Sequence, residues 1–455
     1  MTLVESHEPW LSKVPADWSR SRIRNVVELS PGYSFQPPGS DEICTVIPME
    51  KLSEAGLIDG SNQQTFNEIQ SGLTLFEPGD VVFAKITPCM ENGKGAFISE
   101  LPTRYGFGST EFHVLRPTHE IYGKFLYYAT FNPFFREYAT ENMTGAAGQK
   151  RVSSRFLKDT RLFLPPIPEQ ELIAAYLDAS CAAIDAAVAA KRRQIETLEA
   201  LRKSTIQRVV TRGLHSKVSL KSTGNSWLKQ VPKSWQLKAL KRLALLQTGL
   251  TLGKLYEGAL IERPYLRVAN VQDGHLDLEN VTTIEVPKAV ATGVELKPND
   301  VLMTEGGDLD KLGRGYLWEG QIPGCLHQNH IFAVRCVRHL LLPRFLTYLT
   351  SSQYGRDYFE ATGKRTTNLA STNATKVRAF PILLPPLPEQ ERLVAFLDEK
   401  LGDLASTKRI LNEQITTLLA YRKSLIHECV TGKRRITDED VARVQKSESL
   451  VERSG

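Results

Sequence analysis

Two long stretches of the chain alternate apolar and polar positions with the period of a coiled-coil helix. They begin at the proline-rich segments 164–170 and 384–390 and continue without a further proline beyond residues 200 and 420. Apolar residues recur there in alternating steps of four and three, which places them on one face of an α-helix. This seam consists of Leu177, Ile184, Val188, Ile195 and Leu198 in the first stretch, and of Leu397, Leu401, Leu404, Leu411, Ile415 and Leu418 in the second.

A narrow apolar seam on an isolated helix would face water, so each stretch needs a partner helix. We expect the two stretches to pair with each other in antiparallel fashion, because two matched segments on one chain have a high effective concentration. A homo-oligomeric coiled coil, in which each seam pairs between chains, is the alternative.

The two stretches belong to a larger internal repeat. Leu-Pro-Pro-Ile-Pro-Glu-Gln-Glu at 164–171 returns as Leu-Pro-Pro-Leu-Pro-Glu-Gln-Glu at 384–391, and 21 of 50 positions are identical between 164–213 and 384–433. A second echo, Trp-Leu-x-x-Val-Pro-x-x-Trp, occurs at 10–18 and at 227–235. A globular block followed by a helix therefore occurs twice, an arrangement that suits a target with two parts.

The predicted fold is α+β, with two globular domains separated by two long helices that form an intramolecular antiparallel coiled coil with a pseudo-two-fold repeat. We expect the first globular domain at 1–163, the first helical region at 164–214, a linker at 215–226, the second globular domain at 227–383, the second helical region at 384–434 and a polar tail at 435–455.

Short strands broken by turn residues are expected in each globular block. They are predicted at Val46–Met49 and Phe76–Lys85 in the first block, and at Tyr265–Gly274 and Leu296–Met303 in the second. A helical stretch with aromatic residues follows in each, at Phe125–Tyr138 and Phe345–Tyr358, where we expect the rings to pack in the core.

A polar, basic loop separates the aromatic stretch from the long helix in both halves, at 144–155 and 362–373. Glycine allows a loose backbone, while Gln, Asn, Arg and Lys are the side chains that read base edges or hold phosphates. A solvated loop without a ligand would have a similar composition, but its presence at the same place in both halves favours function. The candidate DNA-binding residues are Gln149, Lys150, Arg151, Ser153, Lys364, Arg365, Thr367 and Asn368, together with Lys85, Lys94 and Arg314, which lie near turn glycines.

The composition of the chain is that of an ordinary globular protein, with 41% apolar and 24% charged residues. A net charge of +6 permits a polyanionic partner without requiring one. The six cysteines form no C-x-x-C pair, which favours reduced thiols over disulfides or zinc. We find no signal peptide and no run of eighteen apolar residues, so we expect a soluble, cytoplasmic protein.

Catalytic motifs are not recognisable in the sequence. Asn132-Pro133-Phe134-Phe135 lacks the second proline of an amino-methyltransferase motif and reads as a turn, and no phosphate-binding G-x-x-x-x-G-K-[ST] loop occurs. His113, His327 and His330 have no metal-site or triad spacing and are expected to pack at strand ends.

The whole pattern resembles the specificity subunits of type I restriction–modification systems. The Leu-Pro-Pro-x-Pro-Glu-Gln marker before each helix and the Trp-Leu-x-x-Val-Pro-x-x-Trp opening of each half are typical of that family, and the resemblance extends over roughly residues 10–432.

The resemblance implies a non-catalytic subunit that binds double-stranded DNA. Each globular block would be a target-recognition domain for one half of a split site, and the helices would set the gap between the halves. It also implies two methyltransferase subunits and motor-nuclease subunits as partners. S-adenosylmethionine, ATP and Mg are then expected in those partners, with no cofactor and no metal in this chain. The alternative is a coiled-coil adaptor with two protein-binding domains.

Overall fold

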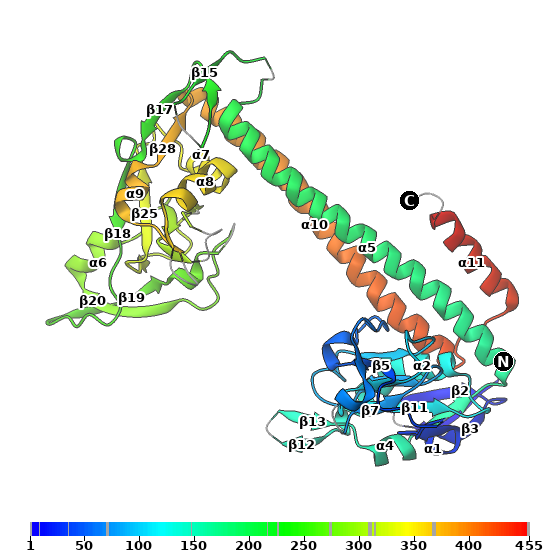
Figure 1. The fold of residues 1–455 in the computed structure, drawn as a ribbon. Coiled ribbons are helices and arrows are strands. Elements are labelled where there is room, and N and C mark those ends of the chain that lie inside the picture. The colour runs from blue at the N-terminus through cyan, green and yellow to red at the C-terminus, as the bar shows by residue number, and fades with distance from the viewer. Residues whose placement is uncertain are drawn as a thin grey trace. The chain divides into compact units, whose positions relative to one another are not determined.

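The structure is a computed structural model that describes the chain apart from residues 1, 9, 35, 70–71, 147, 216, 225–226, 273–274, 308–311, 314, 366–369 and 453–455. At 307, 365 and 447–452 it describes the backbone alone. The chain forms two compact units: unit 1 comprises Met1–Lys191 and Asn412–Gly455, and unit 2 comprises Arg192–Leu411. Each unit consists of a mixed α+β domain and a part of both long helices (Figure 1).

Two four-stranded sheets form the centre of the unit 1 domain. The first is antiparallel, in the order β4 (Val27–Leu29), β11 (Phe112–Pro117), β8 (Val81–Ala84), β9 (Gly95–Phe97). The second has the order β6 (Gln63–Thr65), β5 (Ile43–Ile47), β10 (Gly106–Gly108), β7 (Thr74–Phe76), with β10 parallel to β5. Successive side chains of a strand point to opposite faces. Val81 and Phe83 accordingly pack against helices, whereas Val82 packs against residues of the second sheet, so the first sheet is covered on both faces.

Helices α2 (Gly123–Phe131) and α3 (Pro133–Glu141) contribute to the helical side of this core. The expected single aromatic stretch is thus divided in two at Asn132, whose side chain accepts a hydrogen bond from the Phe134 N–H at 3.1 Å. Pro133 follows as the first helical residue, where its missing N–H costs nothing. Phe125 and Tyr128 are buried, which confirms the expected aromatic packing.

Shorter elements complete unit 1. Strand β3 (Ser19–Arg22) pairs with β14 (Arg161–Leu164), and hairpins form between β1 (Leu3–Glu8) and β2 (Leu11–Pro15) and between β12 (Thr144–Ala146) and β13 (Gln149–Arg151). The helices α1 (Ile23–Val26) and α4 (Ser154–Asp159) flank them. The polar tail forms helix α11 (Asp438–Glu452), which follows the buried Ile436.

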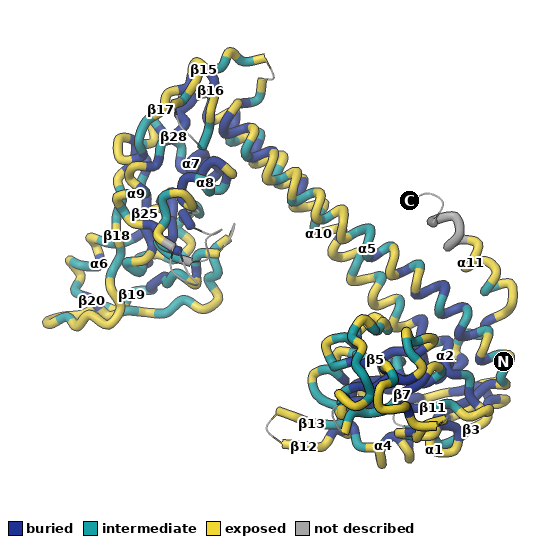
Figure 2. Tube along the Cα trace, viewed as in Figure 1, coloured by how far each residue is buried: buried dark blue, intermediate teal, exposed yellow. Residues whose placement is uncertain are grey.

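Unit 2 repeats this plan. Its antiparallel sheet has the order β18 (Ala244–Thr248), β25 (Ile331–Cys336), β21 (Val301–Thr304), β23 (Gly315–Leu317), and β17 (Gln236–Ala239) pairs with β28 (Pro381–Leu384). The other elements are β15 (Leu220–Ser222), β16 (Gln230–Pro232), β19 (Leu260–Leu266), β20 (Thr282–Pro287), β22 (Gly306–Gly307), β24 (Leu326–His327), β26 (Lys364–Arg365), β27 (Ala370–Ser371), α6 (Lys288–Val294), α7 (Pro343–Ser351), α8 (Gln353–Thr362) and α9 (Ala374–Ala379). Figure 2 shows that burial in both units follows the central strands and the helices beside them.

The two halves share a buried aspartate at the turn before a central strand. The carboxylate of Asp80 accepts hydrogen bonds from the Glu77 N–H and from Arg116 of β11, each at 2.8 Å. Asp300, at the same place 220 residues later, accepts from the Lys297 N–H at 2.8 Å and from Arg335 of β25. The repeated Pro-Gly-Asp and Pro-Asn-Asp sequences therefore form the same kind of turn in both halves, with a buried aspartate paired to an arginine.

The two long helices are α5 (Ile167–Arg212) and α10 (Leu387–Val430). They pair in antiparallel fashion within the chain, since the start of α5 lies in unit 1 with the end of α10, and the reverse holds in unit 2. Lys191 donates to Gln414 at 2.6 Å in unit 1, and Lys408 pairs with Glu199 at 2.6 Å in unit 2. Every predicted seam residue is buried or half-buried, so the predicted coiled coil is confirmed.

The glutamine of the repeated proline-rich motif fixes the start of each long helix. Gln170 is 1% exposed; it accepts a hydrogen bond from the Tyr122 N–H at 2.8 Å and donates to the Pro165 and Glu120 carbonyls. Gln390 makes the same three bonds, to the Leu342 N–H and to the Pro385 and Leu340 carbonyls. The motif recurs because one side chain satisfies three backbone groups at the junction of domain and helix.

Several strand predictions need correction. Residues 49–51 form a 3₁₀ turn after β5, and Phe76–Lys85 divides into β7 and β8 on either side of the Glu77–Asp80 turn. In unit 2, β19 ends at Leu266 and a 3₁₀ turn follows at Val268–Asn270, while residue 274 lies outside the described part. The residues before β21 form the turn around Asp300. The apolar pattern alone predicts longer strands, but hydrogen bonds in the turns end these strands earlier.

One described helix, α5, is long and apolar enough to cross a membrane by length and composition alone, with a mean hydropathy of 1.6 over an 18-residue window. Half of that window is buried inside the structure. Leu177, Cys181 and Ile184 of α5 belong to the core of unit 1, which accounts for the apolar character of this helix.

Candidate nucleic-acid interface

The segment predicted as a basic loop in unit 1 is a β-hairpin. Strands β12 and β13 pair from Thr144 with Arg151 to Ala146 with Gln149, and Gly145 and Gly148 have positive φ angles of 144° and 78°. The hairpin is held along β13 by Thr87, whose N–H donates to the Lys150 carbonyl and whose hydroxyl donates to the Gly148 carbonyl at 2.7 Å. The exposed side chains are therefore presented on an ordered ribbon.

The candidate residues of this hairpin differ in their availability. Gln149 and Lys150 are exposed and free to meet a ligand. Arg151 instead forms a two-pronged pair with Glu111, with Nε–Oε2 and Nη2–Oε1 distances of 2.9 and 2.8 Å. This hydrogen bonding lowers the pKa of Glu111 and keeps the pair charged. Arg151 thus anchors the hairpin to the domain.

Three further candidates in unit 1 have structural contacts. The Ser153 hydroxyl caps helix α4 by accepting from the Phe156 N–H at 3.1 Å. The Lys94 ammonium donates to the Met49 carbonyl at 2.9 Å. The Lys85 backbone bonds to Glu111 and Val152, next to the base of the hairpin, and its side chain is half-buried. The structure therefore brings Lys85 to the hairpin and directs Lys94 toward another loop.

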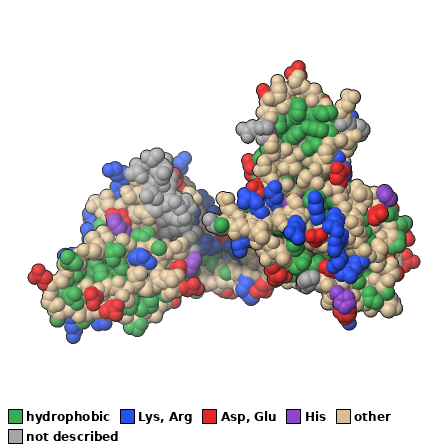
Figure 3. Space-filling model, turned by 90° about the horizontal axis from the view of Figure 1, so that it is seen from below, with side chains coloured by type: hydrophobic (Ala, Val, Ile, Leu, Met, Phe, Trp, Pro, Cys, Tyr) green, Lys and Arg blue, Asp and Glu red, His purple; other side chains and the backbone are tan. Residues whose placement is uncertain are grey.

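Basic residues that are not among the candidates named from the sequence lie beside the hairpin. Arg24 of α1 and Arg155 and Lys158 of α4 are exposed, and Arg22 is half-exposed. Asp159 is the acid among them, 3.1 Å from Arg24 and 3.8 Å from Arg22, so cations remain in excess. Figure 3 shows Lys and Arg side chains gathered on this face of unit 1. We call the face formed by Arg22, Arg24, Arg155 and Lys158 the basic face.

The same position in unit 2 also carries a ribbon. Strand β26 pairs with β27, and β22 joins them, between α8 and α9. Asn373 caps α9 by accepting from the Lys376 N–H at 3.0 Å, as Ser153 caps α4. Among the candidates, Lys364 is exposed, only the backbone of Arg365 is described, and Arg314, Thr367 and Asn368 lie outside the described residues.

His113, His327 and His330 each bind another group of the chain, and the cysteines form no disulfide. His113 and His327 are buried and each bonds a backbone carbonyl, at 2.8 Å to Val152 and 2.9 Å to Ile331, which confirms the expected packing. His330 was expected to pack likewise, but it is exposed and pairs with Glu305 at 2.6 Å. No group of three or more metal-ligating side chains occurs among the described residues, and all six cysteines are unpaired.

Known proteins with the same organisation were found by sequence. Residues 15–197 match a family profile described as "Type I restriction modification DNA specificity domain". The EcoKI specificity subunit of Escherichia coli strain K12 is 23% identical over 394 residues, which cover 81% of each chain. The EcoAI specificity subunit of Escherichia coli is 34% identical over 175 residues, which are 38% of this chain and 29% of that protein. The StySPI specificity subunit of Salmonella potsdam is 23% identical over 92% of this chain and 90% of its own.

The fold is also found in solved structures. A chain from a study entitled "Structural basis underlying complex assembly and conformational transition of the type I R-M system" has a TM-score of 0.71 at 18% identity and covers 92% of this chain and 99% of its own. The HsdS subunit from Thermoanaerobacter tengcongensis has a TM-score of 0.53 at 19% identity, with 92% and 98% coverage. The two-domain architecture with long helices is therefore a known one.

Proposed function

Because this chain belongs to the specificity subunits of type I restriction–modification systems, we propose that it binds double-stranded DNA and selects a bipartite target sequence. The alignment with the EcoAI subunit spans only 29% of that protein, and the proposed activity and partners rest on the residues of this chain. The observation that carries the proposal is the repeat. A two-stranded ribbon stands between the second aromatic helix and a capped short helix in both units, with Gln149 and Lys150 exposed on the first ribbon and Lys364 exposed on the second.

Each domain would read one half of the target. In unit 1 the basic face would hold phosphates, because its exposed arginines and lysine outnumber the one aspartate among them. Gln149 and Lys150, at the end of the hairpin, would reach base edges. Each well-placed bidentate contact is worth roughly 1–3 kcal/mol of discrimination between bases. In unit 2, Lys364 and the neighbouring ribbon would do the same for the other half.

The helix pair would set the gap between the two half-sites and present the docking surface for partner subunits. The partners proposed are two methyltransferase subunits and, in the full complex, motor-nuclease subunits, which would hold S-adenosylmethionine, ATP and Mg. This chain would contribute recognition and no chemistry, in the cytoplasm. None of the relatives named above is an adaptor of the alternative kind.

The test compares two double variants of the chain in complex with its methyltransferase partner. Gln149→Ala with Lys150→Ala should change the base preference at one half-site and leave the other half-site unchanged, as read by mapping methylated sites in a random DNA library. Arg155→Ala with Lys158→Ala should weaken binding to all sequences and reduce the slope of log affinity against log salt by about 2.

Lys13→Ala, at an exposed position of strand β2 in unit 1, is the matched control and should change neither property. Equal weakening of both half-sites by the first double variant would make the hairpin a phosphate clamp and not a reader of bases. If the unaltered complex binds duplex DNA with no dependence on salt, the proposed function is wrong.

A further inference from the structure

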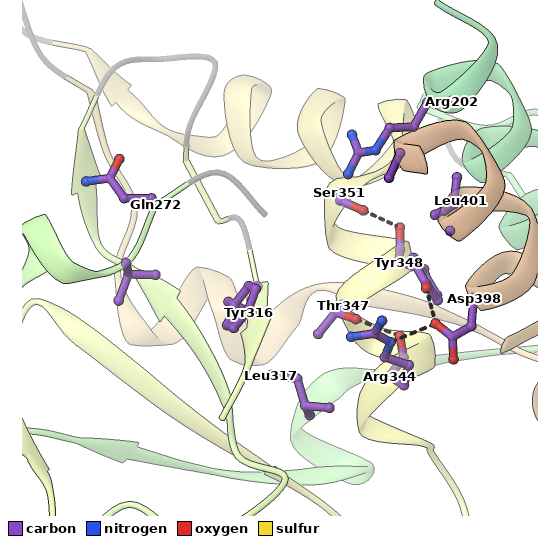
Figure 4. Close-up of a pocket in the computed structure, with 14 residues that line it drawn as sticks. Arg202, Gln272, Tyr316, Leu317, Arg344, Thr347, Tyr348, Ser351, Asp398 and Leu401 are labelled. Carbon is purple, nitrogen blue, oxygen red and sulfur yellow. Dashed lines mark hydrogen bonds and ion pairs between the residues drawn. The ribbon is translucent and has the colours of Figure 1, made fainter. Parts of the chain in front are cut away.

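A cavity of about 360 Å³ lies in unit 2 between helix α7, strand β23 and the helix pair. Figure 4 shows Arg202 of α5 at its upper edge, Arg344 and Tyr348 on α7, and Asp398 on α10. Apolar atoms of Leu317, Leu401 and Ala405 form other parts of the wall. The cavity belongs to neither the ribbon nor the DNA-reading residues proposed above.

The charges of this cavity do not balance. Arg344 pairs with Asp398 at 2.9 Å, and the Tyr348 hydroxyl also donates to that carboxylate. Among the described residues, Arg202 has neither a hydrogen bond nor an ion pair within 4.0 Å. Glu199, one turn earlier on α5, is bound by Lys408 at 2.6 Å. The charge of Arg202 helps to lower the pKa of Glu199, but Arg202 makes no direct ion pair with that carboxylate. Two arginines thus line the cavity with one carboxylate, and that carboxylate is bound by Arg344.

Unit 1 contains the corresponding cavity, of about 330 Å³, built from residues 220 positions away. Lys124 and Asp178 pair at 2.5 Å, and Tyr128 donates to Asp178, as their counterparts do in unit 2. Arg422 stands in the place of Arg202, but here Asp185 lies 3.5 Å from its Nε. The position of Asp185 is occupied in unit 2 by Ala405. The arginine at this position of the repeat is therefore paired with an aspartate in unit 1 but not in unit 2.

We propose that the unit 2 cavity receives an acidic side chain of a partner protein, whose carboxylate pairs with Arg202. A carboxylate matches the planar guanidinium in two parallel hydrogen bonds. The apolar wall fits the methylene stem of such a side chain, and the Tyr316 hydroxyl, which makes no hydrogen bond among the described residues, lies on the wall as a further donor. A duplex phosphate fits less well, because it lies on a wide rod that cannot enter a recess between helices.

The partner we infer is the methyltransferase subunit, and this part of the inference rests on the proposed function. The cavity opens beside α5 and α10 within unit 2, where the helix pair is proposed to dock that subunit. Because the cavity of unit 1 is internally neutral, the anchor should exist on one unit only. Two otherwise similar docking sites would then differ in strength.

Anion binding can be tested on the full chain without the partner. With ¹⁵N-labelled arginine, the Arg202 side-chain resonance, assigned by Arg202→Lys, should shift with added glutarate and saturate. In Ala405→Asp, which supplies the acid that unit 1 has, the shift should disappear, whereas the neutral control Ala405→Asn should keep it. Asp185→Ala should create a new response at Arg422. An unmoved Arg202 resonance, or an equal shift in the Ala405→Asp variant, would overturn the proposal.

Partner binding is tested with the purified methyltransferase subunit. Arg202→Gln and Ala405→Asp should weaken the complex about tenfold or more, the effect of losing one charged hydrogen-bonded pair, and Ala405→Asn should not. Affinity for a target duplex measured without the partner should stay unchanged in all three variants. A loss of duplex affinity in Arg202→Gln and Ala405→Asp would assign the cavity to DNA and overturn the proposal. Failure of the unaltered chain to bind DNA would contradict the proposed function but leave the glutarate response standing.

Discussion

At the scale of single residues, each unit contains a buried histidine whose ring is hydrogen-bonded to the backbone. His113 and His327 are 3% and 0% exposed, and each donates a ring N–H to a backbone carbonyl. The other ring nitrogen of His327 lies 3.3 Å from the Gln247 amide nitrogen. Burial lowers the pKa of both imidazoles to about 4, so both are neutral in the folded chain at neutral pH. Their ordinary value in an unfolded chain is about 6.5.

These two histidines should make the fold sensitive to mild acid. Between pH 6.5 and 4 the unfolded chain binds protons that the folded chain does not, so stability falls as the pH decreases. Each histidine should cost about 2 kcal/mol between pH 7 and pH 5. Urea unfolding at the two pH values measures this loss. The variant His113→Gln with His327→Gln should lose less stability between them; an identical pH dependence would contradict the assignment.

At the scale of elements, a buried glutamine fixes the start of each long helix against its domain. Gln390 is 0% exposed and satisfies two carbonyls and one N–H at the junction of α7, β28 and α10. Its counterpart Gln170 does the same in unit 1. The direction in which each helix leaves its domain therefore depends on a single amide group.

Replacing Gln390 by Ala should lower the free energy of unfolding of unit 2 by about 3 kcal/mol, since several buried backbone groups would lose their partner. Chemical denaturation measures the effect. Gln353→Ala, at the exposed start of α8, is the control and should cost little. A loss below 1 kcal/mol for Gln390→Ala would show that water or a shifted backbone replaces the amide.

The sequence predicted the helices far better than the interface. The seam of α5 and α10 follows from local periodicity, and the proline-rich motif marks where each helix begins. The hairpin around Gln149 depends on Thr87, and the basic face joins Arg24 to Asp159 across 135 residues. Contacts between residues so far apart in the sequence are not revealed by any local pattern. Arg151 was therefore assigned to DNA, although Glu111 binds it.

At the scale of the whole molecule, the repeat suggests that helix length determines which half-site spacing is accepted. Adding four residues to α5 and four to α10, where the helices face each other, lengthens each by one turn of about 6 Å. The preferred gap should then widen by about two base pairs of about 3.4 Å each. The preferred gap is measured by mapping the sites that the variant methylates together with its partner methyltransferase.

A seven-residue addition to each helix keeps the seam in register and should widen the gap by about three base pairs, from about 10.5 Å of added helix. Comparing the two insertions separates helix length from helix rotation. A gap preference that is the same in both variants and in the unaltered chain would rule out the helices as the determinant of spacing.

Unit 1 is built from two separate segments of the chain, and this has a consequence for folding during synthesis on the ribosome. Its core includes Leu425, Ile426, Cys429 and Val430, which are translated only after all of unit 2. Unit 2 is one continuous segment and can close as soon as it emerges. The first domain must meanwhile keep an apolar surface uncovered, and such surfaces invite aggregation and chaperone binding. A nascent chain stopped before α10 ends should therefore be the form most dependent on chaperones.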